Sequence, residues 1–230
     1  MQYNQTSRKF TYILITINVL LFVITTFLGF VINSNILALD FLGGSVFQYI
    51  LQGQIFRLVT ANFLHANIFH ILLNMYALYI LGSIIENEYS SKALFVMYIF
   101  TAIAGSFVSF FINYLLVSIG FKDPNIYIVG VGASTALFGI MGFLLVSNYT
   151  FIDKQSLFNI LFLNIFIGLV FSGIIDNWAH IGGIVGGMLL AVIDNLKAVL
   201  RKEDLLNFWF VASAVVFLAS YIWLIIFNYY

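Results

Sequence analysis

The residues Gly132-Ala133-Ser134-Thr135-Ala136-Leu137-Phe138-Gly139 lie in an apolar run from Ile126 to Val146. A serine among small residues in such a run has two interpretations. Small residues let helices approach closely in lipid, and a serine there can bond to its own helix backbone. Alternatively, the hydroxyl is a nucleophile that a base can reach. The nucleophile interpretation requires that the rest of the chain supply a base and an oxyanion site at the same depth in the membrane.

Composition places the chain in the membrane. Of its 230 residues, 63% are hydrophobic and only 8% are charged, and the mean hydropathy is +1.07. A soluble domain carries about 25% charged residues. We therefore expect an all-α polytopic helical bundle in a lipid bilayer. The net charge of zero and the few basic residues give no reason to expect a nucleic-acid partner, and the absence of cysteine excludes thiolate chemistry and disulfides.

Seven segments are long and apolar enough to be membrane spans, which need about 20 residues. They are residues 11–32, 63–84, 93–117, 126–146, 157–174, 178–193 and 206–227. The first is too long for a signal-peptide core and lacks a small-residue cleavage site, so we expect it to be retained. We divide the chain into an N-terminal segment (1–10), a six-helix core (11–196) and a charged linker with a seventh span (197–230).

Basic residues predict the orientation, because cytoplasmic segments are enriched in them. With the N-terminus inside, seven basic residues lie inside and two outside: Arg8, Lys9, Lys92, Lys154, Lys197, Arg201 and Lys202 against Arg57 and Lys122. Spans two, four and six then run inward from the outer face. Ser134 lies about eight residues into its span, roughly 12 Å along the axis. His70, Asn74 and His180 fall in the same layer.

The second span carries two candidate oxyanion donors. His70 and Asn74 are four residues apart, so they share a helix face, and both side chains can donate hydrogen bonds. Two donors on one face could stabilise a developing oxyanion, or could simply tie helices together. His65 lies about 140° away from His70 on a continuous helix, which predicts a different neighbour for it. Three histidines in one layer could also bind zinc, but the divergence of His65 and the lack of a nearby carboxylate argue against a metal site.

The sixth span carries a candidate base. An ionisable residue such as His180 inside a span is a functional hypothesis by default. Gly183 and Gly187 lie three and seven residues later, on nearly the same face, which lets another helix come close. If that helix is the fourth span, His180 lies beside Ser134 and could act as general base and acid. Asp176 lies one turn further out, so we expect a dyad rather than a triad.

Together these residues resemble the rhomboid family of intramembrane serine proteases, from about Gln54 to Gly187. The motifs are Arg57-Leu58-Val59-Thr60 with Phe63-Leu64-His65, His70 with Asn74-Met75, Gly82 and Glu86 with Tyr98, Gly132-Ala133-Ser134, and Ala179-His180 with Gly183 and Gly187. The resemblance implies that Ser134 is the nucleophile and His180 its base. It implies that His70, Asn74 and the Ser134 backbone amide bind the oxyanion, and that Phe138 stacks on the base. Gly132, Gly183, Gly187, His65 and Arg57 would support the site.

Two residues depart from the usual family pattern. Phe56 precedes Arg57 where the family often has Trp, and the larger departure is at Thr135. Thr135 stands where the family usually has glycine after the nucleophile, and this β-branched side chain is expected to crowd the pocket beside the serine. The seventh span resembles the six-plus-one form found in part of the family. Both dyad residues are present, so the resemblance still implies an active enzyme.

The sequence thus predicts a serine endopeptidase that cleaves in or near transmembrane helices of other membrane proteins, with no cofactor or metal. Its substrates would reach the site past span five, where Phe158, Phe162 and Phe166 form an apolar row. We expect a plasma membrane location, with the N-terminus cytoplasmic and the site open to the outer face. Two alternatives stay open: a transporter with a proton or metal path along its histidines, and a relative that binds membrane helices without cleaving them.

Overall fold

The computed structural model describes residues 8–148, 152–170, 175–192 and 203–229. Within these ranges the regular structure is helical, apart from one isolated antiparallel bridge between Ser45 and Gly130. The long helices are α1 (Lys9–Val31), α5 (Ile68–Glu88), α6 (Ser91–Ser118) and α11 (Glu203–Tyr229), and the shorter apolar helices are α7 (Ser134–Val146), α8 (Lys154–Val170) and α9 (Asn177–Val192). Between α1 and α5 lie α2 (Asn35–Phe41), α3 (Phe47–Leu51), α4 (Arg57–Thr60) and the 3-10 turn η1 (Ala61–Phe63). The predicted all-α membrane bundle is confirmed.

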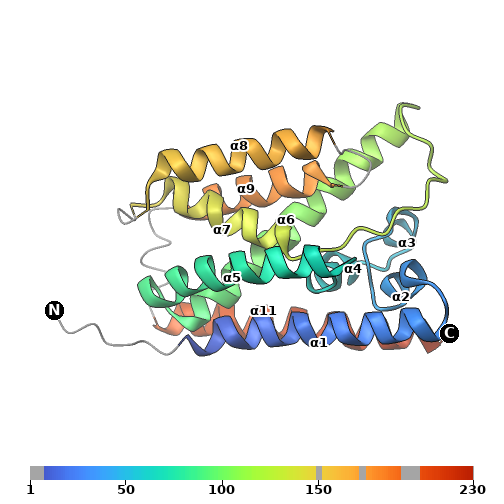
Figure 1. Cartoon of the computed structure of the whole chain (residues 1–230), viewed down its shortest axis with the longest axis horizontal. Coiled ribbons are helices and arrows are strands. Elements are labelled where there is room, and N and C mark those ends of the chain that lie inside the picture. Colours follow the sequence, from blue (N-terminus) through green and yellow to red (C-terminus); the bar gives the residue numbers. More distant parts are fainter. Residues whose placement is uncertain (1–7, 149–151, 171–174, 193–202, 230) are drawn as a thin grey trace.

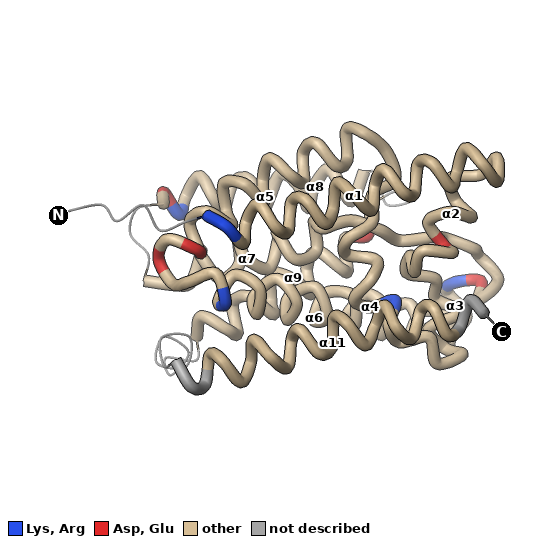
Figure 2. The backbone as a smooth tube through the Cα atoms, turned by 90° about the horizontal axis from the view of Figure 1, so that it is seen from below, with Lys and Arg blue, Asp and Glu red and all other residues tan. Residues whose placement is uncertain are grey.

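The helices form an elongated bundle with α7 and α9 between α8 on one side and α1 and α11 on the other (Figure 1). The long helices α1, α5, α6 and α11 are each long and apolar enough to cross a membrane. Lys, Arg, Asp and Glu residues gather toward the two ends of the bundle (Figure 2). α1 begins at one end of the bundle and α11 ends at the other (Figure 1).

Two helices begin later than the sequence predicts. α5 begins at Ile68, after Asn67, whose side chain accepts a hydrogen bond from the His70 amide as an N-cap. α7 begins at Ser134 rather than near Ile126, and residues 126–133 are not helical. Gly130 pairs with Ser45, and Gly132 has a φ of +136°, which no helix can accommodate. Ser134 is therefore the first residue of its helix and not eight residues inside it.

The short helix α7 is the centre of the bundle. Every residue from Thr135 to Leu144 is buried, as expected for a helix that is apolar on all sides. α6 and α9 pack most extensively against it. A helix surrounded in this way holds its first residue, Ser134, in a fixed place relative to its neighbours.

The end of α5 is joined to the start of α1 through Glu86. Its buried carboxylate accepts hydrogen bonds from the backbone amides of Phe10 and Thr11, both at 2.9 Å, and from the Thr11 hydroxyl at 2.7 Å. The hydroxyl of Ser91 at the start of α6 donates a further bond. One carboxylate thus satisfies orphan amides at the N-terminus of α1, where negative charge is also favoured by the helix dipole.

The last helix, α11, packs against α6 and α4 on the side of the bundle away from α8 (Figure 1). The ring of Phe217 lies 4.9 Å from that of Phe63 and 6.2 Å from that of Phe95, between centroids. These edge-on aromatic contacts attach α11 to the core. The division into a core of residues 11–196 and a following unit stays a prediction, because part of the linker lies outside the described residues.

Candidate active site

Ser134 and His180 meet where α7 and α9 begin. The Oγ of Ser134 lies 2.9 Å from Nε2 of His180, within hydrogen-bonding distance. The other ring nitrogen, Nδ1, is buried and has no hydrogen-bond partner in the part of the chain that the structure describes. An uncharged imidazole with its proton on Nδ1 would accept the serine proton at Nε2. The arrangement can therefore act as a nucleophile with an adjacent general base.

The imidazole is held by an aromatic ring on the serine's own helix. The ring centroids of Phe138 and His180 are 4.1 Å apart and the rings are nearly parallel, at 12°. Phe138 follows Ser134 by one helical turn, so both side chains face α9. The stacking predicted for Phe138 is present in the structure, and it restricts the rotation of the imidazole.

Glycines on α9 bring the two helices into backbone contact. A Cβ on Gly183 would lie 2.3 Å from the Thr135 carbonyl oxygen, and a Cβ on Gly187 would lie 1.8 Å from that of Gly139. Contact this close excludes any side chain at either glycine. The close approach inferred for this glycine face is therefore present, and it allows the short Ser134–His180 distance.

Gly132 and the donors of α5 border the other side of the serine. A Cβ on Gly132 would lie 2.7 Å from Nε2 of His70 and 3.4 Å from the Ser134 Oγ. His70 is thus close to the candidate nucleophile. Asn74 is buried one turn further along α5, and its Nδ2 has no hydrogen-bond partner among the described residues. The Ser134 amide lies in the first turn of α7, where the helix supplies no acceptor. Three donors are therefore available for an oxyanion.

The position expected for His65 is wrong. The sequence predicted that His65 and His70 point apart, but their ring centroids lie 5.1 Å apart in an edge-to-face contact. Helical periodicity does not apply here, because α5 begins only at Ile68 and His65 lies in the preceding loop. His65 is 1% exposed, and neither ring nitrogen has a partner among the described residues. It packs against His70.

The side chain of Thr135 contacts α6, and the crowding expected beside Ser134 stays a prediction. The Thr135 side chain is buried, and its methyl Cγ2 lies 2.2 Å from where a Cβ on Gly105 of α6 would be. The same Cβ would lie 2.4 Å from the Ala179 carbonyl oxygen. The absence of a side chain at Gly105 on α6 thus leaves room for the Thr135 methyl group. Nothing in the sequence spacing links these two positions.

Arg57 belongs to the loop region and not to the Ser134–His180 pair. It is 3% exposed, and its Nη1 lies 2.9 Å from the Oδ1 of Asp40 and donates to the Gly44 carbonyl at 2.5 Å. Burial lowers the pKa of the Arg57 guanidinium, and the neighbouring Asp40 carboxylate opposes that shift. Asp40 also accepts a 2.6 Å hydrogen bond from the Tyr127 hydroxyl. Arg57 therefore braces the loop that leads to Ser134.

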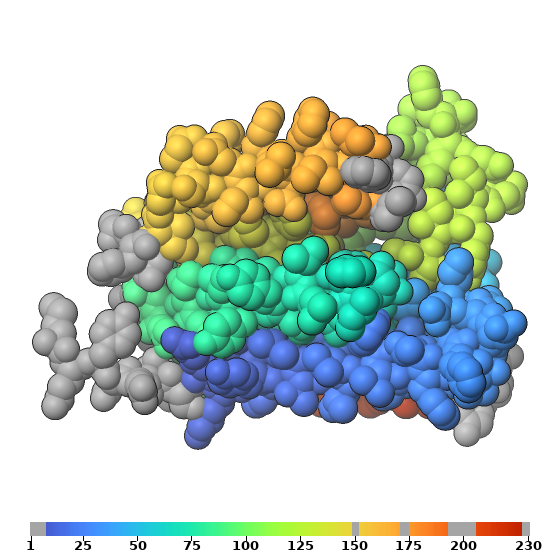
Figure 3. All heavy atoms as spheres, viewed as in Figure 1, coloured from blue at the N-terminus to red at the C-terminus, as the bar shows by residue number. Residues whose placement is uncertain are grey.

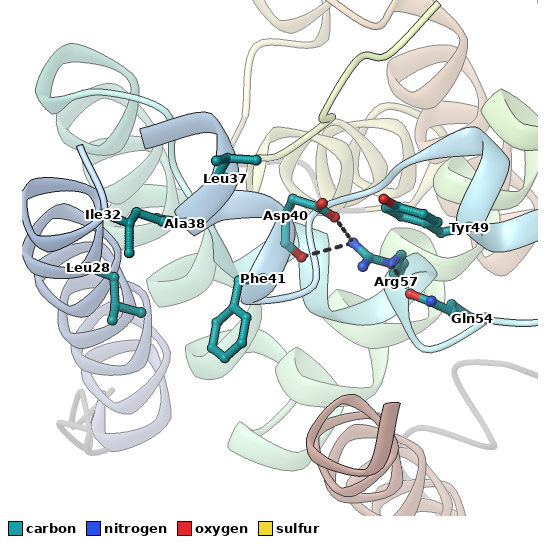
Figure 4. Close-up of a pocket in the computed structure, with 9 residues that line it drawn as sticks. All are labelled: Leu28, Ile32, Leu37, Ala38, Asp40, Phe41, Tyr49, Gln54 and Arg57. Carbon is teal, nitrogen blue, oxygen red and sulfur yellow. Dashed lines mark hydrogen bonds and ion pairs between the residues drawn. The ribbon is translucent and has the colours of Figure 1, made fainter. Parts of the chain in front are cut away.

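A pocket of about 530 Å³ lies beside this ion pair. Figure 4 shows Asp40 and Arg57 directed toward one another, with Tyr49 and Gln54 nearby and the apolar side chains of α1 and α2 opposite. Neither Ser134 nor His180 lines it. Sequence reasoning missed Asp40 as the partner of Arg57, because the two are 17 positions apart in a region without helical or strand periodicity.

The apolar row expected on span five lies on an outer surface. Phe158, Phe162 and Phe166 of α8 are 51%, 65% and 55% exposed, and the first two rings stack with centroids 6.4 Å apart. In the space-filling view a furrow runs between α5 and α8, with atoms of α7 deeper in it (Figure 3). The furrow leads from the surface toward the helix that carries Ser134.

Comparison with known proteins identifies the family of the chain. Residues 52–197, more than half of the chain, match the family model described as Rhomboid domain. The chain is 31% identical over 191 residues to Rhomboid protease GluP of Bacillus subtilis (strain 168), covering 79% of this chain and 34% of that protein. It is 34% identical over 164 residues to RHOMBOID-like protein 6, mitochondrial, of Arabidopsis thaliana, covering 67% and 49% respectively.

A third relative is Rhomboid protease AarA of Providencia stuartii, 28% identical over 167 residues that cover 65% of this chain and 59% of that protein. The chain thus spans from about a third to somewhat over half of the length of these relatives. With the matched domain and the helical membrane bundle, they establish that this multi-pass membrane protein belongs to the rhomboid family.

Proposed function

We propose that this chain is a serine endopeptidase that hydrolyses peptide bonds in or near transmembrane helices of other membrane proteins. The observation that carries the proposal is the 2.9 Å contact between the Ser134 Oγ and His180 Nε2. Two of the relatives are named rhomboid proteases, which supports the same activity class. The catalytic unit is a dyad, since the buried Nδ1 of His180 has no carboxylate partner among the described residues.

The reaction proceeds by acyl transfer. His180 Nε2 takes the proton of the Ser134 hydroxyl as Oγ attacks the scissile carbonyl carbon, giving a tetrahedral intermediate. The imidazolium then gives that proton to the leaving amine, and the C–N bond breaks to leave an acyl ester on Ser134. Water attacks the ester with His180 again as base, which releases the new carboxyl end and restores the hydroxyl. Stacking on Phe138 keeps the imidazole in reach through both halves.

Negative charge on the tetrahedral oxygen is stabilised by donors around Gly132. His70 approaches the serine closely at this glycine, and Asn74 offers an Nδ2 that is buried without a partner among the described residues. The Ser134 amide supplies a third donor. Donors of this kind lower the barrier most when they are fixed in advance, as groups on packed helices are.

The substrate would approach from the lipid side. A peptide bond inside a helix is shielded, so a substrate helix must unwind locally before Ser134 can attack. The furrow between α5 and α8 gives a path from the lipid surface (Figure 3), and α8 carries the exposed rings of Phe158 and Phe162. The seven-to-two distribution of basic residues supports a cytoplasmic N-terminus and a site open to the outer face of a plasma membrane.

Cleavage of a defined transmembrane substrate in proteoliposomes tests the proposal. The wild-type protein should release the two expected fragments, and Ser134→Ala and His180→Ala should each abolish release while leaving the melting temperature within a few degrees. Cleavage by either variant at the wild-type rate would reject the dyad. A folded wild-type protein that cleaves none of a panel of transmembrane substrates would favour a non-catalytic relative. Histidine-dependent proton or metal flux without cleavage would favour the transporter alternative.

A further inference from the structure

Since Nδ1 of His180 has no carboxylate partner among the described residues, the position of its ring depends strongly on the backbone of α9. Stacking on Phe138 fixes the tilt of the imidazole, but a sliding or fraying α9 would still carry Nε2 away from Ser134. His180 is only the fourth residue of that helix, and terminal turns fray readily. The position of His180 therefore requires a contact that stabilises the first turn of α9.

Asp176 closes that first turn. It directly precedes α9, and its Oδ1 accepts a 3.0 Å hydrogen bond from the Ala179 amide, which is the geometry of an N-cap. Its carbonyl oxygen accepts a 3.2 Å bond from the His180 amide, the first bond of the helix. The negative charge also suits the positive end of the helix dipole. The residue that carries the imidazole is thus bonded through its backbone to Asp176.

The same carboxylate is tied to a different helix. Its Oδ2 accepts a 2.5 Å hydrogen bond from the Ser109 hydroxyl of α6, and Ser109 is itself 7% exposed. The Asn113 side chain donates to the Ser109 carbonyl at 2.8 Å, and the Lys122 ammonium donates to the Asn113 side-chain oxygen. The chain of bonds from Lys122 to Asp176 anchors the start of α9 to α6.

One turn earlier on α6, Gly105 makes the second contact. A Cβ there would lie 2.4 Å from the Ala179 carbonyl oxygen and 2.9 Å from the Gly183 nitrogen. α6 therefore touches α9 on both sides of His180 along the chain, by hydrogen bonding at Ser109 and by backbone contact at Gly105. The hydrogen-bonded contact is directional, so it can set the rotation and register of α9.

We propose that Asp176 is a positioning residue for His180: its carboxylate, held between Ser109 and the first turn of α9, sets where the imidazole meets Ser134. The inference rests on the proposed protease function. It assigns Asp176 no contact with substrate and no part in proton transfer. Asp176 orients the backbone that carries the imidazole, whereas the aspartate of a catalytic triad orients the imidazole by bonding to it directly.

The test compares Asp176→Ala with Asp176→Asn in the full-length protein. Asparagine caps helices about as well as aspartate and can still bond to Ser109, so it should keep kcat within about threefold of wild type. Alanine loses both bonds, and we expect kcat on a transmembrane substrate to fall about 10- to 100-fold with KM nearly unchanged. The rate at which a fluorophosphonate labels Ser134 should fall in parallel.

Ser90→Ala is the matched control. Ser90 caps the start of α6 by accepting a hydrogen bond from the Ala93 amide, and it is not part of α9 or of its contacts with Asp176. Ser90→Ala should lower the melting temperature as much as Asp176→Ala does, by about 2–4 °C, with kcat unchanged. Ser109→Ala, which cuts the tether but leaves the cap, should lower kcat in the same direction as Asp176→Ala.

Wild-type kcat in Asp176→Ala or in Ser109→Ala would overturn the positioning role. An equal loss in Asp176→Asn and Asp176→Ala would also overturn it, since charge rather than position would then be what matters. Failure of the protease proposal itself would give a different result. Either the wild-type protein would not cleave the substrate, or Ser134→Ala would still cleave it.

Discussion

A Cβ on Gly187 would lie 1.8 Å from the carbonyl oxygen of Gly139, so α7 and α9 touch through their backbones. The same face of α9 presents Gly183 to the Thr135 carbonyl one turn nearer the dyad. Any side chain at these positions must push the helices apart. Because Ser134 lies on α7 and His180 on α9, their separation is set by this contact.

Gly187→Ala should therefore reduce both stability and activity. Overpacking of this kind costs about 1–3 kcal/mol, and the dyad distance must grow as α9 is displaced. The checks are thermal unfolding in detergent and kcat on a transmembrane substrate. Gly130→Ala is the control, since a Cβ there would make an ordinary 3.5 Å contact with Ser45. Equal activity of the two variants would mean that the glycine contact does not set the dyad.

Removal of the Asn74 amide should affect the transition state and not substrate binding. We expect Asn74→Ala to lower kcat about 10²- to 10³-fold with KM little changed, as for other oxyanion donors. Asn18→Ala is a matched control, because Asn18 is also a buried asparagine but its Nδ2 bonds to the Leu14 carbonyl of its own helix. If Asn74→Ala raised KM and left kcat intact, Asn74 would be a substrate-binding residue instead.

The stacked ring of Phe138 should contribute to turnover. Phe138→Leu keeps an apolar side chain but loses the stacking on His180, which is worth about 0.5–1.5 kcal/mol and corresponds to a 2- to 13-fold fall in kcat. Phe143→Leu changes a buried ring on the same helix whose aromatic partner is Tyr89, and it should lose stability without this loss of kcat. Identical kinetics in the two leucine variants would contradict a role for the stacking.

Glu86 should matter for stability far from the dyad. Glu86→Ala leaves the amides of Phe10 and Thr11 unpaired, and hydrogen bonds to charged groups contribute about 1.5–3 kcal/mol each. We expect the melting temperature to fall by more than about 5 °C, with kcat near wild type at temperatures where the protein is folded. Glu86→Gln keeps one acceptor and should lie between. An unchanged melting temperature in Glu86→Ala would mean that α1 is not held by this contact.

Much of the site follows from the sequence because its residues obey helical periodicity. The four-residue spacings from His70 to Asn74 and from Ser134 to Phe138, and the glycine face of α9, each predict which side chains share a face. Charge counting then predicts that three helices bring these faces into one layer. The contact of Ser134 with His180 agrees with that reasoning.

The rest depends on where helices begin, which hydropathy does not reveal. Residues 126–133 are apolar enough for a span, but the positive φ of Gly132 and the Ser45–Gly130 bridge are incompatible with a helix there. His65 lies outside α5 for a similar reason, so its contact with His70 could not be found from spacing. The pairing of Thr135 with Gly105 is a tertiary match between distant positions, and neither residue alone predicts it.

Mapping of the serine that reacts with a fluorophosphonate tests the central claim most directly. The intact protein in membranes is labelled and digested, and the adduct is located by mass spectrometry. A hydroxyl activated by His180 should give one modified serine, Ser134, and His180→Ala should lose the adduct while remaining folded. An adduct on another serine, or undiminished labelling of Ser134 in His180→Ala, would contradict the dyad.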